Sequence, residues 1–317
     1  MAKIPLAGDD PTLLAVDAAL LKQPSWRSRA ISISSVGKEC GRAIWYAYRW
    51  VKQVERSARL IKAAANGHVD EPLMAERLRL VEGVDLQTVD PATGKQFLYT
   101  ALDGHLKGYC DGHIIGLLQA AKTPHVWEHK SREEKYLREL QKLKATLGEK
   151  QALKAWSAEY YGQAQLYMHF SGLTRHYLTC STPGLRECVS VRTDYDPVYA
   201  LALVERARRI KEAHEAPPRI GDADHFVCRM CDYRDICHER AMPERNCRTC
   251  VRSTPAPRGR WECERWAKLL THEEEAAGCP THLFLPSLVP AEQIDATEDS
   301  ITYRLEDGSL WVDAEGR

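Results

Sequence analysis

Two acidic residues and a lysine occupy positions from which they could form one small chemical centre. Asp111 ends a short apolar segment, and Glu128 and Lys130 are separated by one residue in the segment 123–130. In an extended strand, residues two apart point to the same face, so Glu128 and Lys130 share a face and His129 points away. If the strand of Asp111 is the neighbour in the sheet, two carboxylates and an ammonium converge. A carboxylate pair suits a hard cation such as Mg²⁺, and a lysine beside it can orient or activate water.

The bulk composition excludes several classes of protein. The chain has 317 residues with 44 basic and 44 acidic side chains, so its net charge is zero. Without a global positive field, any contact with nucleic acid must come from local patches of charge. No apolar run reaches the ~18 residues of a membrane-spanning helix, and the N-terminus lacks the apolar core of a signal peptide. We therefore expect a cytoplasmic protein that has no membrane contact.

The cysteines are numerous and unevenly distributed. Of the eleven, seven lie within 52 residues. In a reducing compartment, such clustering favours metal or iron–sulfur ligation over disulfide bonds. The clustered cysteines are Cys228, Cys231, Cys237, Cys247, Cys250, Cys263 and Cys279. Three others fall on expected strands, where we expect them to be buried and unreactive: Cys110, Cys180 and Cys188.

Both helices and strands must position these side chains. Apolar periodicity and capping residues predict helices at 11–22, 42–48, 54–66, 68–82, 132–150, 152–171 and 196–215. Gly67 marks the end of one of them, and the charged segment 132–150 is either a solvated helix or a mobile arm. Strands are predicted at 84–89, 96–102, 105–115, 123–130, 175–180 and 187–192, with a hairpin in 300–313. The fold class is therefore α/β (mixed α+β), with a central mixed sheet flanked by helices and a cysteine-rich module near the C-terminus.

The order of these features resembles a known arrangement. The sequence resembles the PD-(D/E)xK nuclease superfamily, in which the same features follow in the same order: a helix with an acidic residue, three strands, an Asp, a Glu-x-Lys and a long helix. The pattern is similar to the RecB-like exonuclease branch of that superfamily. The resemblance implies a restriction-endonuclease-like core in which Lys130 is the catalytic lysine. It implies that the metal ligands are Glu71 or His68 on the preceding helix, Asp111, Glu128 and the backbone carbonyl of His129. His68 and Glu71 are three residues apart and share a helix face.

A further motif lies on the long helix that follows. Gln163 and Tyr167 are four residues apart, so they share a helix face. They resemble the Gln-x-x-x-Tyr motif of the same branch, which assigns them to the catalytic site. Their amide and hydroxyl groups could donate hydrogen bonds to a phosphate or to DNA ends. The alternative is an ordinary core tyrosine beside a capping glutamine.

The first set of clustered cysteines has the spacing C-x2-C-x5-C and needs a fourth ligand. In RecB-like nucleases with an iron–sulfur cluster, the fourth cysteine comes from upstream of the nuclease core, and Cys40 matches in place and context. The resemblance thus implies a structural 4Fe–4S cluster on Cys40, Cys228, Cys231 and Cys237. On chemistry alone, a zinc site with four cysteine ligands is also possible. Otherwise Cys40 is a small buried side chain with no ligand role.

The second set has the spacing C-x2-C-x12-C-x15-C and comprises Cys247, Cys250, Cys263 and Cys279. Two cysteines with two residues between them supply half of a tetrahedral zinc site, and two later thiolates complete it. Trp261 and the turn 258–260 fit a small zinc-ribbon hairpin, and His272 and His282 are alternative ligands. Because the segment 226–282 has little apolar periodicity, we expect metal rather than core packing to hold it together.

Three domains follow from these motifs. Residues 1–240 form the RecB-like nuclease domain closed by the iron–sulfur cluster, residues 241–290 the zinc-ribbon-like module, and residues 291–317 a hairpin tail. The appended module would contact DNA or a partner. Basic and aromatic residues are interleaved at 42–52 and 258–268, which either contact a DNA strand or are faces of amphipathic helices.

These features predict a DNA exonuclease that hydrolyses phosphodiester bonds with Mg²⁺ or Mn²⁺. The resemblance implies a phage-type or CRISPR-associated enzyme that acts on linear single- or double-stranded DNA in the host cytoplasm. Phage recombination beside a single-strand annealing protein is the expected setting, and a homo-oligomer is an open option. Two other classes remain. One is an iron–sulfur redox protein, against which the sequence shows no Gly-rich nucleotide-binding fingerprint. The other is a catalytically inactive DNA-binding protein that retains the motifs without turnover.

Overall fold

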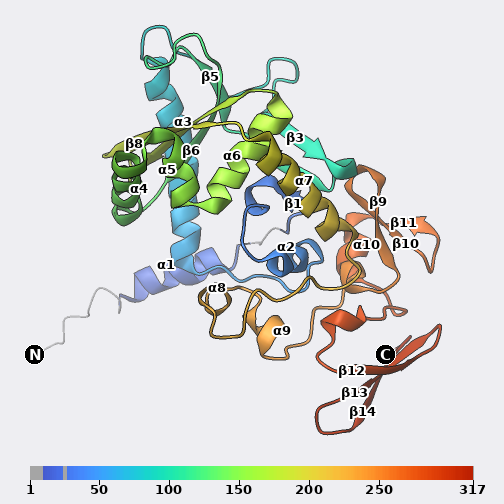
Figure 1. Cartoon of the computed structure of the whole chain (residues 1–317). Coiled ribbons are helices and arrows are strands. Elements are labelled where there is room, and N and C mark those ends of the chain that lie inside the picture. The colour runs from blue at the N-terminus through green and yellow to red at the C-terminus, as the bar shows by residue number, and fades with distance from the viewer. Residues whose placement is uncertain (1–9, 24–26, 317) are drawn as a thin grey trace, which may run out of the picture.

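The computed structural model describes residues 10–23 and 27–316. Its centre is a five-stranded sheet with the strand order β2-β5-β6-β7-β8 (Figure 1). The strands are β2 (Asp85–Gln87), β5 (Gly112–Ile115), β6 (His125–Ser131), β7 (Arg175–Ser181) and β8 (Cys188–Asp194). β6 and β7 are parallel, whereas the other neighbouring pairs of this sheet are antiparallel. A parallel pair needs a long crossover, and helices provide it.

Helices cover the sheet on both faces. The helices of the described residues are α1 (Pro11–Leu21), α2 (Gly41–Tyr48), α3 (Ala58–Arg79), α4 (Glu134–Leu147), α5 (Glu149–Trp156), α6 (Ala158–Ser171), α7 (Pro197–Glu212), α8 (Phe226–Arg229), α9 (Arg234–His238) and α10 (His272–Ala277). Those that pack against this sheet are α3, α4, α5 and α6. Because strand side chains alternate between faces, Trp127 of β6 packs with Met74 of α3. Leu178 of β7 packs on the other face with Leu153 of α5. The predicted mixed α/β fold, a mixed sheet flanked by helices, is confirmed.

Three small sheets surround this centre. β1 (Ile31–Ser32), β4 (Leu106–Tyr109) and β3 (Leu98–Ala101) form one of them, in that order. In the cysteine-rich segment, β9 (Ser253–Ala256), β10 (Arg260–Cys263) and β11 (Lys268–Leu269) form an antiparallel sheet. The tail forms β12 (Glu292–Ala296), β13 (Ser300–Arg304) and β14 (Leu310–Ala314). β13 and β14 pair as an antiparallel hairpin, as predicted.

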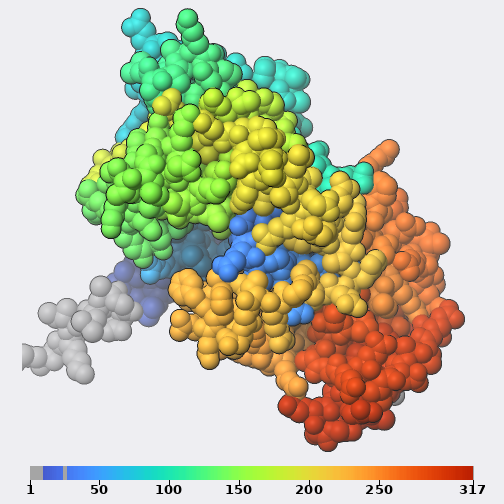
Figure 2. Space-filling view, viewed as in Figure 1, coloured from blue at the N-terminus to red at the C-terminus, as the bar shows by residue number. Residues whose placement is uncertain are grey.

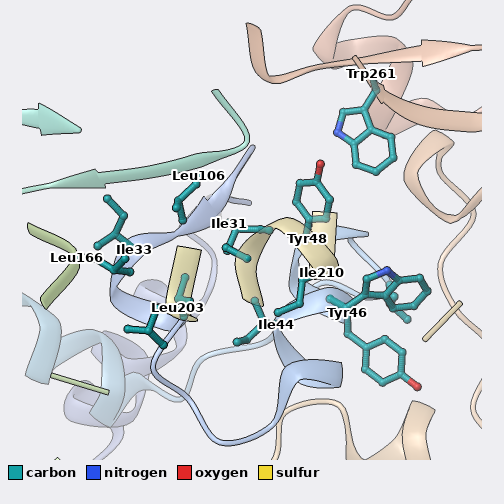
Figure 3. Close-up of a cluster of buried hydrophobic side chains, with 14 of the residues drawn as sticks. Ile31, Ile33, Ile44, Tyr46, Tyr48, Leu106, Leu166, Leu203, Ile210 and Trp261 are labelled. Carbon is teal, nitrogen blue, oxygen red and sulfur yellow. The ribbon is translucent and has the colours of Figure 1, made fainter. Parts of the chain in front are cut away.

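The largest hydrophobic cluster joins segments from both ends of the chain. It combines Ile31 and Ile44 from the N-terminal part with Leu203 and Ile210 of α7 and with Trp261 of β10 (Figure 3). At the surface, the blue N-terminal segment shows between the yellow and orange segments (Figure 2). Apolar packing therefore helps to hold the cysteine-rich segment, which corrects the expectation that metal alone does so. The domain boundaries at residues 240 and 290 stay predictions.

The helix that carries the candidate acidic ligand is longer than expected. The two helices predicted at 54–66 and 68–82 are one helix, α3, and Gly67 and Pro72 lie inside it. A Cβ at Gly67 would meet no atom within 4 Å, so neither crowding nor a positive φ requires glycine there. Burial of residues 70, 74 and 75 against the rest of the fold holds the helix continuous and overrides both helix-breaking residues.

Two other predicted elements are divided. The segment 105–115 forms β4 and β5 in different sheets, and Cys110 and Asp111 lie between the two strands. The helix predicted at 152–171 is divided at Ser157, whose hydroxyl accepts a hydrogen bond from the backbone N–H of Tyr160 and caps α6. The charged segment 132–150 is mostly helical, and Leu137 and Leu140 of α4 are buried. It is therefore a packed helix rather than a mobile arm.

The isolated cysteines behave differently from one another. Cys110 and Cys180 are buried, as expected, but Cys188 is exposed. Cys188 begins β8, which is an edge strand of the central sheet, so this expectation was wrong. Across residues 10–23 and 27–316, none of the helices combines the length and apolar character needed to cross a bilayer.

Candidate active site and cysteine clusters

Strand β6 and the residue before β5 bring the predicted charged groups together. Glu128 and Lys130 lie on one face of β6, and the Lys130 Nζ is 2.5 Å from the Glu128 Oε1. Asp111 lies beside them, and its Oδ2 accepts a hydrogen bond of 2.8 Å from the backbone N–H of His129. Only 3% of Glu128 and 8% of Asp111 are exposed. The carboxylate of Asp111 thus takes the place of a backbone acceptor at the point where the strand breaks.

The electrostatics show that negative charge is in excess at this site. Burial, and then the charge of Asp111, raise the pKa of Glu128 to about 8, although Lys130 opposes the shift. Burial also raises the pKa of Asp111, against the effects of Lys130 and the His129 N–H. Burial lowers the pKa of Lys130, but Glu128 and Asp111 outweigh it and raise that pKa well above its usual value. One ammonium does not neutralise the carboxylates around it.

The third carboxylate comes from α3. Burial, and then Asp111, raise the pKa of Glu71 to about 7, which places Glu71 at the same site. His68 is exposed, and no interaction joins it to the other candidate ligands. Between the two alternatives for the helix ligand, the geometry favours Glu71.

A neighbouring residue, Asp70, fixes the position of α3. Asp70 is 2% exposed and uses both carboxylate oxygens, accepting from the Ser131 hydroxyl at 2.6 Å and from the Gly184 N–H at 3.0 Å. Sequence reasoning missed this residue. The available signal was its spacing of four from Met74, which places it on the buried face of the helix.

Gln163 and Tyr167 of α6 contact protein groups rather than open space. The Gln163 Nε2 donates to the Glu128 Oε1 at 2.7 Å, and the Tyr167 hydroxyl donates to the Tyr109 carbonyl at 2.5 Å. Both side chains are buried. These donors hold Glu128 and the strand that leads to Asp111. Their contact with a phosphate or a DNA end stays a prediction.

The fit of a divalent cation can be judged from the donor atoms. Among the residues described, no group of three or more His, Cys, Asp or Glu side chains is arranged so that it could hold a metal ion. The Glu128 Oε2 is nevertheless buried without a hydrogen-bond partner, and oxygen donors of Glu71, Asp111 and Glu128 match the preference of Mg²⁺. A cation would offset their mutual repulsion, but binding by all three requires side-chain movement. The carbonyl of His129 stays a predicted ligand.

The first cysteine set is gathered around one small cavity. Its lining includes Cys40, Cys228, Cys231 and Cys237. Burial, and then the thiols of Cys40 and Cys237, raise the pKa of Cys228. Cys40 is the N-cap residue of α2, so the cavity joins the beginning of the fold to α8 and α9. The cavity volume of about 20 Å³ has room for a sphere of the size of one water molecule, so a four-iron cluster would require the thiols to move apart.

The second set also converges. Burial, and then Cys250, Cys279 and Cys263, raise the pKa of Cys247 to about 12. β9 and β10 form the predicted hairpin between the paired and the later cysteines, with Arg258 and Gly259 at positive φ in its turn. The two alternative ligands make other contacts. His272 stacks edge-on against Trp50, and the His282 Nε2 is 3.2 Å from the Thr249 hydroxyl.

The two basic and aromatic segments differ, because 42–52 is mainly buried whereas 258–268 is mainly exposed. Arg49 of the first segment is fully buried, as is Arg248 outside both segments, and both lie over the ring of Trp261. Arg248 also lies 3.7 Å from the centre of the Trp50 ring and forms an ion pair with Glu275 at 2.7 Å. Sequence reasoning offered DNA contacts or helix faces for the two segments and made no prediction for Arg248. It missed that the arginines stack between tryptophans from distant parts of the chain.

Comparisons with known proteins give weak structural overlaps. No protein family matches the sequence, and no curated protein shows significant similarity to it. The structure of SSO0001 overlaps with a TM-score of 0.42 at 15% identity, over 72% of this chain and 96% of the other. An alkaline exonuclease, LHK-Exo from Laribacter hongkongensis, overlaps with a TM-score of 0.40 at 14% identity, over 62% of this chain and 90% of the other. LHK-Exo in complex with dAMP gives 0.40 at 14% identity, over 61% and 88%. Overlaps of this size establish neither a family nor an activity for the chain.

Proposed function

We propose that this protein is a metal-dependent deoxyribonuclease that removes nucleotides from DNA ends. The observation that carries the proposal is the convergence of Asp111, Glu128 and Glu71 with a lysine that is ion-paired to one of them. This group of charges has no evident structural use, because burying it raises the free energy of the fold. Buried groups with strongly shifted pKa values are characteristic of functional sites.

Each residue has a distinct part in the proposed reaction. Asp111, Glu128 and Glu71 would hold Mg²⁺ or Mn²⁺, which when bound lowers the pKa of a water molecule and offsets negative charge on the phosphate. Lys130, placed beside Glu128, orients the attacking water and stabilises the charge that develops on the phosphate oxygens. Gln163 holds the carboxylate of Glu128 by its 2.7 Å hydrogen bond.

The two cysteine sets would bind metal centres that hold distant segments of the chain together. The first would hold an iron–sulfur cluster, with zinc as the alternative, and would tie the start of α2 to α8 and α9. The second would hold zinc at the base of the β9–β10 hairpin. Thiolates suit both kinds of centre, so metal and sulfide analysis of anaerobically purified protein distinguishes them.

The test of the nuclease is cleavage of end-labelled DNA with Mg²⁺ or Mn²⁺ by the wild-type protein and by Asp111→Asn and Lys130→Gln. Linear DNA should be degraded and covalently closed circular DNA spared, and both variants should be inactive while remaining folded. Glu82→Gln is the control, because Glu82 is exposed on the surface. Metal-dependent cleavage by purified Asp111→Asn at the wild-type rate would refute the proposed mechanism. Cleavage of circular DNA would support a nuclease activity but show that it does not require a DNA end.

A further inference from the structure

A polar cavity lies apart from the carboxylate site. Its volume is about 320 Å³, and it is lined by the beginning of α2, by the end of α9 and by residues 287–290. In Figure 1, α9 lies at the lower end of the molecule, whereas β6 lies in its upper part. The basic side chains that line the cavity are Arg42, Arg219, His238 and Arg240. The cavity is therefore a separate and strongly basic feature.

Two of these arginines have neutral groups as their neighbours. Arg42 lies over the ring of Tyr46 at 5.6 Å, and its Nε is buried without a hydrogen-bond partner. Arg219 is exposed and donates to the backbone carbonyl of Cys237. A ring face and a carbonyl carry no net charge, so both guanidinium groups can still bind an anion. Arg240 differs, because it pairs with Glu306.

His238 also lines the cavity, and its Nε2 is buried without a hydrogen-bond partner. This ring nitrogen is a further polar group that a bound molecule could contact.

We propose that the cavity binds a phosphate group of a nucleotide or of a nucleic-acid strand, held between Arg42 and Arg219. The planar guanidinium offers paired N–H donors that match two phosphate oxygens. The volume lies at the lower end of the ~300–1,000 Å³ typical of small-molecule sites, which leaves room for a nucleoside beside the phosphate. That the source is a DNA strand rests on the proposed nuclease function, whereas the recognition of phosphate does not.

The cavity is also connected to the first cysteine set. The two cavities share five lining residues, which are Arg42, Tyr46, Arg219, Cys237 and His238. The carbonyl of Cys237 accepts the hydrogen bond from Arg219. A metal centre on these cysteines would therefore fix one of the two arginines. A strand bound here would be held at a second point, away from the bond that is cut.

The experiment measures binding in the Asp111→Asn background, so that cleavage does not consume the probe. The probes are inorganic phosphate, dAMP and a short single-stranded oligonucleotide, titrated over a range of salt concentrations. Arg42→Gln and Arg219→Gln should each weaken oligonucleotide binding by about tenfold, as expected when one charged hydrogen bond is removed. Each substitution should also reduce the steepness of log affinity against log salt by ~0.7, the value for one phosphate of a single strand. The control is Arg186→Gln, an exposed arginine in the turn between β7 and β8.

The outcomes separate the possibilities. Unchanged affinity for all three probes in both variants overturns the proposal. Loss of phosphate and dAMP binding with unchanged oligonucleotide binding keeps a nucleotide site and rejects the strand contact. If Arg42→Gln loses its metal or unfolds, Arg219→Gln decides alone, and wild-type affinity there rejects the cavity. Arginine-dependent binding without any cleavage by the wild-type protein would refute the nuclease and leave the phosphate site standing.

Discussion

Glu128→Gln replaces a buried carboxylate by its neutral analogue of the same shape. The amide oxygen can still accept from Gln163 and Lys130, as the Glu128 Oε1 does. The other oxygen, which has no hydrogen-bond partner, becomes an NH₂ group near Asp111. The variant therefore reproduces the protonated form of Glu128 with little change in packing. It should be inactive because a ligand is removed, yet more stable than the wild type in the absence of metal.

The size of the effect follows from the pKa of Glu128. Its usual value is 4.5 and its value in the fold is about 8, so the folded state holds the proton more tightly than the unfolded state. The resulting stability is fully present below pH 4.5 and is lost as the pH rises through about 8. At ~1.4 kcal/mol per pKa unit, ionising the residue costs the metal-free fold about 4–5 kcal/mol by pH 8.

The assay is thermal unfolding in EDTA at pH 5 and pH 8. Glu128→Gln should nearly match the wild type at pH 5 and unfold roughly 8–20 °C higher at pH 8, taking ~2–4 °C per kcal/mol for a chain of this order of size. Mn²⁺ should stabilise the wild type more at pH 8 than at pH 5 and leave the variant unchanged. Glu82→Gln, on the surface, should show none of these differences. A variant less stable than the wild type at pH 8 would refute the view that repelling carboxylates destabilise this site.

Three further substitutions test other parts of the structure. Tyr167→Phe removes the hydrogen bond to the Tyr109 carbonyl and should cost about 1 kcal/mol in urea unfolding while lowering kcat more than it raises KM; an unchanged kcat contradicts the positioning role. Cys228→Ser should lower the metal content measured by elemental analysis and destabilise the protein, whereas full metal content would remove Cys228 from the ligand set. Arg248→Leu leaves the buried carboxylate of Glu275 without its ion-pair partner and should lower the free energy of unfolding by about 3–5 kcal/mol. The double variant that adds Glu275→Leu should recover part of this loss. If it does not, stacking of Arg248 on the aromatic rings contributes more than the ion pair.

Local spacing in the sequence anticipated the centre of the candidate site. The alternation of a strand places Glu128 and Lys130 on one face, and their 2.5 Å contact follows from it. The same holds for Gln163 and Tyr167, whose spacing of four places both on one face of α6, a helix that is buried on all sides from residue 161 to residue 168. What spacing cannot supply is the partner of each group. Gln163 binds Glu128 because α6 packs on β6, and that packing is a property of the whole fold.

Long-range packing explains the remaining differences. Gly67 is a helix-ending residue by its local preference, but burial of Asp70 and its neighbours keeps α3 intact. Arg49 lies in a segment with the composition of a surface patch, yet it is enclosed by aromatic rings, one of them from a segment about 200 residues away. Arg248 is enclosed in the same way by Trp50 and Trp261. Local composition cannot distinguish an arginine that binds DNA from one that stacks in a core. The contacts of these side chains depend on how distant segments meet.

The shared hydrophobic cluster has a consequence for the order of events during synthesis. Its N-terminal contributors, such as Tyr46 and Tyr48, leave the ribosome long before partners such as Leu285 and Leu288. At ~5–20 residues per second, the roughly 240 residues between them take about 10–50 s to make. During that interval the candidate catalytic residues are already synthesised, but the core that supports them is incomplete. A nascent or truncated chain that lacks Leu285 and Leu288 should therefore expose apolar surface to chaperones and lack the proposed cleavage activity.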